Sequence, residues 1–142
     1  MQQTLVLIKP DAFSRNIVNK VMGRIEEKGY RICDMRFHYR APRDLIELHY
    51  CRDEHQPYFN GNCDFMTSGP IIAIVYEGKN AIKGIRQLQG NRDTPGTIRG
   101  DYVTDVRCNL LHASDSEDTA QREIRIWFPK IEPSESDEPD EP

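Results

Sequence analysis

The sequence lacks any apolar run long enough to cross a membrane, since its longest, Ile71 to Tyr76, falls far short of the roughly 20 residues required. No basic segment followed by an apolar one opens the chain, so we expect a cytoplasmic protein with no membrane partner. The four cysteines, at positions 33, 51, 63 and 108, form no Cys-x-x-Cys pair. This spacing disfavours a zinc knuckle or a disulfide framework and favours reduced thiols.

A phosphate-binding loop of the Walker type, Gly-x-x-x-x-Gly-Lys-Ser/Thr, is also missing, and no internal repeat of fixed period is visible. The 142 residues correspond to one domain, which is long enough to bury a core without disulfides or metals. We therefore expect a single folded unit.

The formal net charge of −4 hides an uneven distribution of charged residues. Residues 131–142 contain six acidic residues and no basic ones, so residues 1–130 carry a net charge of +2. A segment of this composition cannot bury apolar surface, and we predict an acidic disordered tail at 131–142 after a folded domain at 1–130. The mildly basic body suits a small anionic ligand better than a nucleic-acid duplex.

The apolar pattern predicts three main strands. Thr4–Ile8 and Ile71–Tyr76 are apolar runs without alternation, which is typical of central strands covered on both faces. In Cys33–Tyr39 apolar and polar residues alternate, which indicates an edge strand with one wet face. A fourth, short strand is predicted at Leu110 and Leu111.

Apolar spacing and cap residues predict the helices, at Ile17–Gly29, Pro42–Cys51, Asn80–Gly90 and after Ser114–Ser116 as far as Phe128. In the second of these, Leu45 and Leu48 are expected to face inward. Residues 56–69 are interpreted as a turn plus a short helix, and residues 90–101 as a loop. The order of elements favours a split β-α-β arrangement, with an antiparallel sheet covered by helices on one side.

The stretch from Asn109 to Ser116 concentrates the groups that could carry chemistry. The short strand would bring His112 outward at its end, beside the start of the last helix, where unpaired backbone N–H groups attract phosphate. Imidazole is also the side chain whose neutral, nucleophilic form is plentiful near pH 7. A phosphohistidine intermediate is one reading, and a strand-end histidine with satisfied ring nitrogens is the other.

Other side chains could support such a nucleophile. Glu123 lies at the edge of the inward stripe of the last helix, where it could fix the tautomer of His112 or remain an ordinary solvated glutamate. Arg86 and Arg99 could neutralise a phosphate, although either could be a solvated surface charge. Lys9 follows a central strand, a position where sites are often built.

Five segments in this order carry a family resemblance: Thr4–Ala12, His49-Tyr50, Ser68–Pro70, Pro95–Asp101 and, most specifically, Asn109–Asp115. From residue 3 to about residue 129, the chain resembles the nucleoside diphosphate kinases. The resemblance implies a ferredoxin-like α/β fold, an α+β sandwich with a four-stranded antiparallel sheet covered by helices. It also implies a homo-oligomer built from dimers, usually a hexamer and sometimes a tetramer.

The same resemblance implies a ping-pong reaction, in which His112 takes the terminal phosphate of a nucleoside triphosphate and passes it to a diphosphate. By position, it assigns roles around that histidine to Glu123, which orients the ring, to Ser114, which supports it, and to Tyr50 beside it. Other positions would hold the nucleotide: Lys9 and Asn109 the sugar, Arg86 and Arg99 the phosphates, and Phe59 with Val106 the base. Magnesium would be carried on the nucleotide phosphates, with no metal-binding residue in the protein.

The chain departs from the usual family pattern in the 90–95 loop, which is shortened, and near the expected base slot. Thr94 is the one candidate in that loop for a phosphate-contacting threonine. Asn62 replaces a usual apolar residue and Arg107 a usual glycine. The acidic tail replaces a structured extension.

Two longer polar side chains and a shorter loop should narrow the base site, which favours pyrimidines by roughly 1 to 3 kcal/mol. No residue in the implied set reads the 2′-hydroxyl, so deoxynucleotides should also be accepted. Two other classes of function stay open, a nucleic-acid-binding module on the same fold and an inactive scaffold. The strands at Thr4–Ile8 and Ile71–Val75 carry no aromatic residue for base stacking, which argues against the first.

Overall fold

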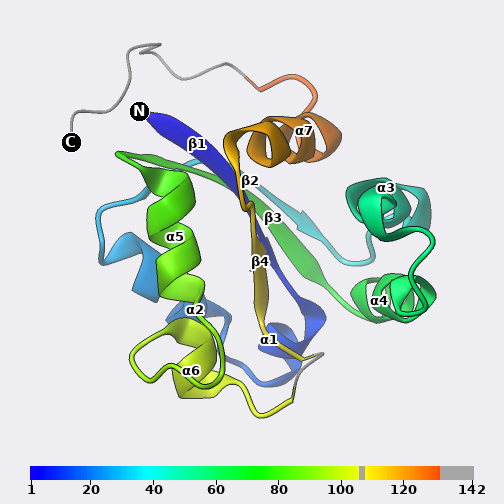
Figure 1. The fold of residues 1–142 in the computed structure, drawn as a ribbon, viewed down its shortest axis with the longest axis horizontal. Coiled ribbons are helices and arrows are strands. Elements are labelled where there is room, and N and C mark those ends of the chain that lie inside the picture. The colour runs from blue at the N-terminus through cyan, green and yellow to red at the C-terminus, as the bar shows by residue number, and fades with distance from the viewer. Residues whose placement is uncertain (106–107, 132–142) are drawn as a thin grey trace.

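We describe residues 1–105 and 108–131 of the chain in a computed structural model (Figure 1). Val106 and Arg107, to which the sequence assigns base-site roles, lie outside the described residues, as does the segment from 132 onward. Within the described part, no helix combines the length and apolar character needed to cross a membrane.

One four-stranded antiparallel sheet forms the centre of the fold, in the order β2-β3-β1-β4. The strands are β1 (Gln2–Ile8), β2 (Arg31–His38), β3 (Ile71–Gly78) and β4 (Leu111–Ala113). The central strand β1 pairs with β3 on one side and with β4 on the other, where Leu7 faces His112. This confirms the predicted ferredoxin-like α+β fold and puts His112 beside the buried central strand β1.

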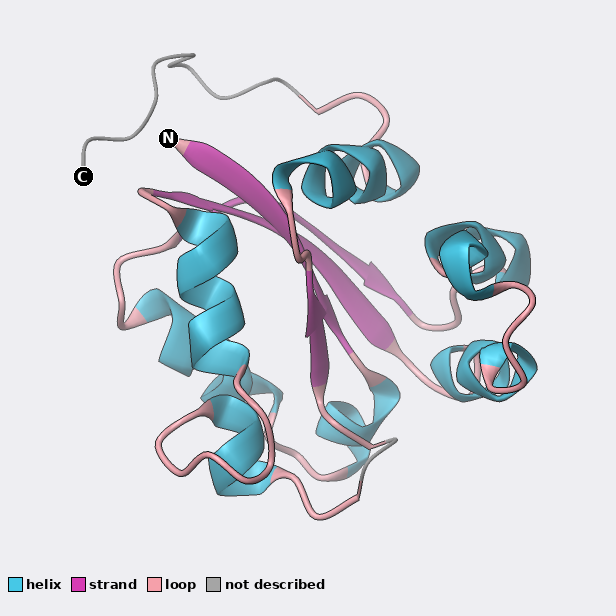
Figure 2. Ribbon diagram, viewed as in Figure 1, coloured by secondary structure: helices cyan, strands magenta, loops and turns pink. Residues whose placement is uncertain are grey.

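The helices are α1 (Pro10–Ser14), α2 (Val18–Glu26), α3 (Arg43–His49), α4 (Phe59–Met66), α5 (Ala81–Gln89), α6 (Ile98–Tyr102) and α7 (Glu117–Trp127) (Figure 2). Two of them, α1 and α6, were not expected. Asn16, with a positive φ of 55°, separates α1 from α2. The predicted 90–101 loop contains α6 because the Thr97 side chain accepts a hydrogen bond from the Gly100 N–H and caps it.

Helices cover both faces of the sheet, so the expectation of a one-sided cover is wrong. Leu5 and Leu7 of β1 pack under α3, α4 and α7, whereas Val6 and Ile8 pack under α2 and α5. Figure 1 shows these two layers on opposite sides of the sheet. The physical reason lies in β1 itself, because consecutive apolar residues give a strand two apolar faces that both need covering.

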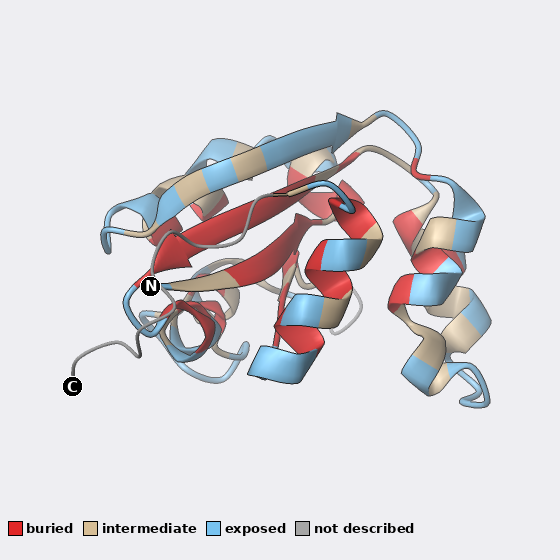
Figure 3. Ribbon diagram, turned by 90° about the horizontal axis from the view of Figure 1, so that it is seen from above, coloured by how far each residue is buried: buried red, intermediate tan, exposed pale blue. Residues whose placement is uncertain are grey.

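The apolar side chains of the edge strand β2, which the alternation predicted to be buried, are exposed. Phe37 has 56% of its surface exposed, and Met35 and Tyr39 are exposed as well. Figure 3 shows this strand as a largely exposed strip above the buried β3 and β1. A shift of register between Ile32 and Asp34 accompanies this change of face. The folded chain therefore carries an uncovered row of large apolar side chains.

In α3, Leu48 was expected to face inward but is 52% exposed. Ile46 and His49 take the inward positions instead, three residues apart on one face of the helix. A polar ring therefore occupies a core position that sequence patterning assigned to leucine.

The last helix begins and faces inward as predicted. Ser116 caps α7 by accepting a hydrogen bond from the Thr119 N–H. Ala120, Ile124 and Trp127 are buried on its inner face. Glu123 lies within that stripe rather than at its edge, since it is only 1% exposed. The helix thus points a carboxylate into the core beside β4.

Candidate active site

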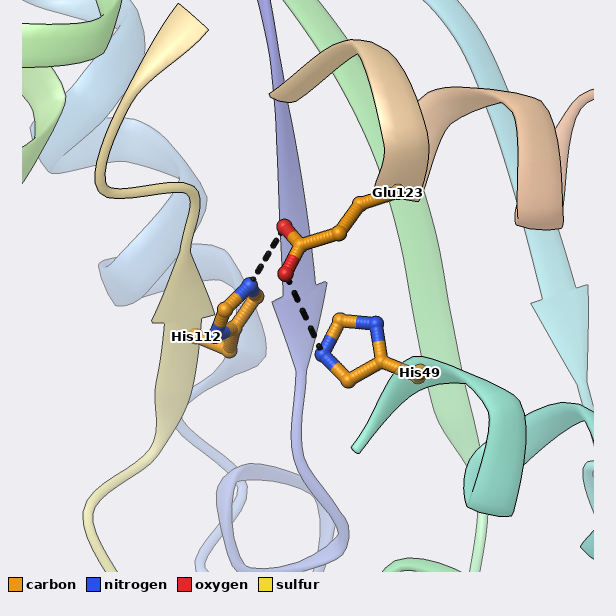
Figure 4. A group of neighbouring side chains, drawn as sticks. All are labelled: His49, His112 and Glu123. Atoms are coloured by element: carbon orange, nitrogen blue, oxygen red, sulfur yellow. Dashed lines mark hydrogen bonds and ion pairs between the residues drawn. The ribbon is translucent and has the colours of Figure 1, made fainter. Parts of the chain in front are cut away.

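Three elements bring His112, Glu123 and His49 together in front of β1 (Figure 4). His112 projects from β4, Glu123 from α7 and His49 from the end of α3. The His112 Nε2 atom lies 2.8 Å from Glu123 Oε1, and the His49 Nε2 atom lies 3.8 Å from Glu123 Oε2. The rings of the two histidines lie edge to face with 4.6 Å between their centroids. A buried carboxylate therefore stands between two imidazoles.

Ser114 completes the support of this carboxylate. Its hydroxyl donates to Glu123 Oε1 over 2.7 Å and accepts from the Leu5 N–H of β1. The Ser114 N–H in turn donates to the Leu5 carbonyl. Glu123 is therefore tied through Ser114 to the central strand.

His49 is held in one protonation state and one tautomer. The Trp127 indole N–H, which can only donate, lies 3.1 Å from His49 Nδ1, so that nitrogen accepts and the proton sits on Nε2. Burial, with the nearby His112 adding to it, places the pKa of His49 well below its usual value, so the ring is neutral. Its Nε2–H therefore faces Glu123 without adding a charge.

The same tautomer bears on metal binding. The donor atoms of His49, His112 and Glu123 lie within 4.8 Å of one another. A proton on His49 Nε2 removes the lone pair that a metal would need there, and magnesium prefers oxygen ligands in any case. This group of residues therefore does not fit a resident magnesium ion.

His112 keeps its second nitrogen available. Because Glu123 accepts from Nε2, the ring carries its proton there and leaves a lone pair on Nδ1. The side chain of His112 is 21% exposed, so a ligand can reach it. The site can therefore present a neutral, oriented nucleophile at Nδ1.

Cationic side chains are anchored along the backbone on both sides of His112. Arg99 donates to the carbonyls of Asn109 and Leu111, over 3.2 and 2.7 Å. Arg86 reaches the Ala113 carbonyl over 3.4 Å, and Lys9 Nζ donates to Asn109 Oδ1 over 2.7 Å. The three predicted cations thus converge on the segment that contains His112.

Burial, with the neighbouring cations adding to it, lowers the pKa of Lys9 and of Arg99. Burial, together with Arg99, lowers the pKa of Lys9 to about 8. Burial, together with Arg86, lowers the pKa of Arg99 to about 10. Lys9, Arg86 and Arg99 together concentrate positive charge beside His112, which favours binding of an anionic group such as phosphate.

A strained turn sets the start of β4. Leu110 is buried with a positive φ of 75°, and the Leu111 N–H donates to the Asn109 carbonyl, which closes a γ-turn. The backbone groups of Leu110 are held on both sides, because its carbonyl accepts from the Lys9 N–H and its N–H donates to Asp11 Oδ2. The turn places Asn109 and His112 relative to Lys9.

The remaining predicted residues differ in burial and in their contacts. Tyr50 is next to His49, with 4.8 Å between the ring centroids, and burial raises the pKa of its phenol, which stays protonated. The Thr94 hydroxyl donates to Asn91 Oδ1 within the short loop. Phe59 packs against the core under α4, whereas the adjacent Tyr58 is 46% exposed.

The main residues that sequence reasoning missed are His49 and Asp11. His49 and Asp11 both lay in segments that carry the family resemblance, but polar residues in those segments gave no sign of burial. Tyr58 precedes Phe59 directly; Tyr58 is exposed, whereas Phe59 is half-buried. The Asn62 N–H donates to the Tyr58 carbonyl, so these two residues lie one helical turn apart.

A histidine aimed by a buried carboxylate, with cations around it, defines an enzyme site suited to moving phosphoryl groups. The family model for nucleoside diphosphate kinase matches residues 2–133. A nucleoside diphosphate kinase of Acanthamoeba polyphaga mimivirus is 65% identical over 130 residues, covering 92% of this chain and 95% of the relative. One from Archaeoglobus fulgidus is 46% identical over 132 residues, covering 90% and 87%.

Solved structures agree with the sequence relatives. A nucleoside diphosphate kinase from Halobacterium salinarum, in complex with CDP, is 38% identical with a TM-score of 0.86, covering 96% of this chain and 94% of that one. One from Encephalitozoon cuniculi is 33% identical with a TM-score of 0.88, covering 94% of each. The chain therefore belongs to the nucleoside diphosphate kinase family and is a phosphotransferase.

The hydrogen bond from the Leu110 N–H to Asp11 predicts different stabilities for two substitutions of Asp11. Asp11→Ala should lose about 1 to 3 kcal/mol of unfolding free energy, because the buried Leu110 N–H then lacks an acceptor. Asp11→Asn keeps an acceptor and removes a carboxyl whose pKa burial raises. A raised folded-state pKa means that deprotonation costs stability, so Asp11→Asn should match or exceed the parent at pH 7, with the gap narrowing in acid. Urea unfolding at pH 7 and at an acidic pH measures these free energies of unfolding. Equal stability of Asp11→Ala and Asp11→Asn at pH 7 would contradict the role of Asp11 as the acceptor for the Leu110 N–H.

Proposed function

We propose that the chain transfers the terminal phosphate of a nucleoside triphosphate to a nucleoside or deoxynucleoside diphosphate by a ping-pong reaction through His112. One observation carries this proposal, namely the 2.8 Å contact from His112 Nε2 to the buried Glu123, which leaves Nδ1 free. The family membership of the chain supplies the substrate class.

In the first half-reaction, the Nδ1 lone pair attacks the γ-phosphorus, and the bond from that phosphorus to the β–γ bridging oxygen breaks. The diphosphate leaves with the electron pair of that bond. In the second half-reaction, a terminal oxygen of another diphosphate attacks the phosphohistidine, and the N–P bond electrons return to Nδ1. Positive charge that develops on the ring is stabilised by Glu123 through Nε2–H.

The cations and polar groups around the ring would bind the nucleotide. Arg86 and Arg99 would neutralise charge on the transferred group, which is the main requirement of phosphoryl transfer. Lys9 and Asn109, already hydrogen-bonded to each other, would hold the sugar 3′-hydroxyl region, and Tyr50 would border the nucleophile. Magnesium bound to the nucleotide phosphates would offset more of their charge.

Two competing functions fit the structure less well. A nucleic-acid-binding module of this fold uses an open sheet face, whereas helices cover both faces of β1 and β3. An inactive scaffold would have no need to keep a buried carboxylate, an oriented imidazole and three cations in mutual contact with one strand.

The four cysteines are free thiols, which suits the reducing cytoplasm that we propose as the location of the protein.

Incubation with γ-labelled ATP tests the proposed reaction. The parent protein should acquire an acid-labile, alkali-stable phosphoryl group that a nucleoside diphosphate then removes, and His112→Ala should acquire none. Glu123→Gln should label at least about 100-fold more slowly, since a misaimed ring loses much of its rate. A parent protein without label, or a labelled His112→Ala, would refute the phosphohistidine mechanism.

The base site supports a preference for pyrimidines, including deoxy forms. Phe59, the half-buried first residue of α4, would stack on the base, and Asn62 lies on the next turn of the same helix. An amide near the base edge adds hydrogen-bonding groups and narrows the slot, as the sequence also indicates for Arg107. The structure from Halobacterium salinarum was solved with CDP, a pyrimidine nucleotide.

The double substitution Asn62→Leu with Arg107→Gly should lower the ratio of kcat/KM for dTDP over dGDP, by about fivefold or more, since such contacts are worth roughly 1 to 3 kcal/mol. Steady-state kinetics with both diphosphates measures the ratio. Asn60→Leu, an exposed change on the same helix, is the control and should leave the ratio unchanged. An unchanged ratio in the double variant would end this proposal.

The exposed edge of the sheet supports a homo-oligomer, with a dimer joined along β2 and a hexamer as the full assembly. An edge strand with a row of exposed apolar side chains, here Met35 and Phe37 followed by Tyr39, is typical of a surface that a second copy covers. Phe37→Asp should shift the sedimenting species toward the monomer, whereas Arg125→Asp on the exposed side of α7 should not. Identical masses for the parent and Phe37→Asp would exclude this edge as the interface.

A further inference from the structure

Arg122 joins the last helix to the end of α3, across more than 70 residues of sequence. Its Nη1 donates to the Leu48 carbonyl and its Nη2 to the His49 carbonyl, each over 3.3 Å. Nη1 also lies 3.6 Å from Cys51 Sγ, and Nη2 lies 3.8 Å from Glu123 Oε2. One guanidinium therefore contacts the α3 terminus and the buried carboxylate together.

We propose that Arg122 is a positioning residue for the phosphoryl transfer, which fixes the α3 wall of the site and supplies a positive charge beside Glu123. This inference rests on the proposed function of the preceding section. It extends that function to Arg122, to which the resemblance assigns no role. In the described residues, Arg122 forms no hydrogen bond with His112 or with the side chains that we propose bind the nucleotide.

The positional part follows from the end of α3. The last carbonyls of a helix have no partner within it, and a cation there satisfies them and complements the helix dipole. His49 and Tyr50 are the residues at and just after this end, and His49 stacks edge to face on His112. A shift of the capped end would therefore displace the ring that borders the nucleophile.

The electrostatic part follows from the burial of Glu123. A carboxylate removed from water needs hydrogen bonds and a nearby positive charge to remain ionised. His112 and Ser114 donate to it, but His49 is neutral, so Arg122 provides a fixed charge at Oε2. An ionised Glu123 keeps the His112 proton on Nε2 and Nδ1 free.

Arginine suits this place better than lysine. Its planar group bridges two successive carbonyls and still faces the carboxylate, whereas a lysine ammonium is a single point of charge on a flexible stem. Arg122→Lys therefore separates the two parts of the proposal, since it keeps the charge and loses the bridge. Arg122→Gln removes the charge and most of the bridge.

The pH profile of kcat/KM gives a readout that a purely structural role would not move. Among the described residues, the titratable and charged groups that act on Glu123 are His112 from β4, His49 and Tyr50 from the end of α3, and Arg122 itself. Lys9 after β1 and Arg52 after α3 act on His49. Loss of a positive charge raises the pKa of a carboxyl and of an imidazole alike. The acid limb of the profile should therefore move to higher pH in Arg122→Gln and stay in place in Arg122→Lys.

Steady-state kinetics should show kcat reduced about tenfold or more in Arg122→Gln, with KM within about twofold, because ring displacements on the order of 1 Å cost up to about 100-fold in rate. Arg122→Lys should lose less. Arg125→Gln, on the exposed side of the same helix, is the matched control and should behave like the parent. Thermal unfolding confirms that each variant is folded.

The inference is overturned if Arg122→Gln matches Arg125→Gln, if only its KM changes, or if its acid limb does not move. Should Arg122→Gln fail to fold, Arg122→Lys decides the positional part, because parental kcat in that variant would refute it. The parent protein serves as the separate check on the proposed function. Without a phosphoenzyme in the parent, the reaction itself fails, whereas a phosphoenzyme with normal Arg122 variants overturns only the positioning role.

Discussion

The hydrogen bond from His112 Nε2 to Glu123 is the interaction on which the rest of the site depends. It requires a carboxylate in the core, where burial is costly unless every lone pair has a partner. The fold meets this requirement with Ser114 anchored on β1, a neutral His49 held by Trp127, and Arg122 at the rim. These supports come from separate elements, so the nucleophile is aimed only when α3 and α7 pack together against the sheet.

The second constraint is the strained entry into β4. A positive φ at a buried leucine is unfavourable by itself, and it persists because Lys9 and Asp11 hold both backbone groups of Leu110. The strand that follows the turn presents two carbonyls to these cations. Arg99 donates to the Leu111 carbonyl and Arg86 to the Ala113 carbonyl. Strain, cations and nucleophile are therefore parts of one arrangement, in which the strand that carries the histidine also organises the groups around it.

Much of this arrangement could be predicted from the sequence, because apolar runs and caps are local signals. The central strands and the Ser116 cap follow from such signals. The outward row on β2 could not be predicted, since alternation identifies two faces but not which one a partner layer covers. In α3 the inward position belongs to His49 rather than Leu48, and only its tertiary contacts with Trp127 and Glu123 explain a polar residue there. The three cations could be proposed from the sequence and their roles from the family resemblance, but the hydrogen bonds that anchor them on Asn109, Leu111 and Ala113 could not be predicted without coordinates.

The central claim is that Glu123 occupies Nε2 and so directs chemistry to Nδ1. Phosphorus NMR of the phosphoenzyme, unfolded in alkali and compared with authentic phosphohistidine isomers, distinguishes the two nitrogens directly. The account predicts a single species with the phosphoryl group on Nδ1 of residue 112. A phosphoryl group on Nε2, or equal amounts of both isomers, would contradict it.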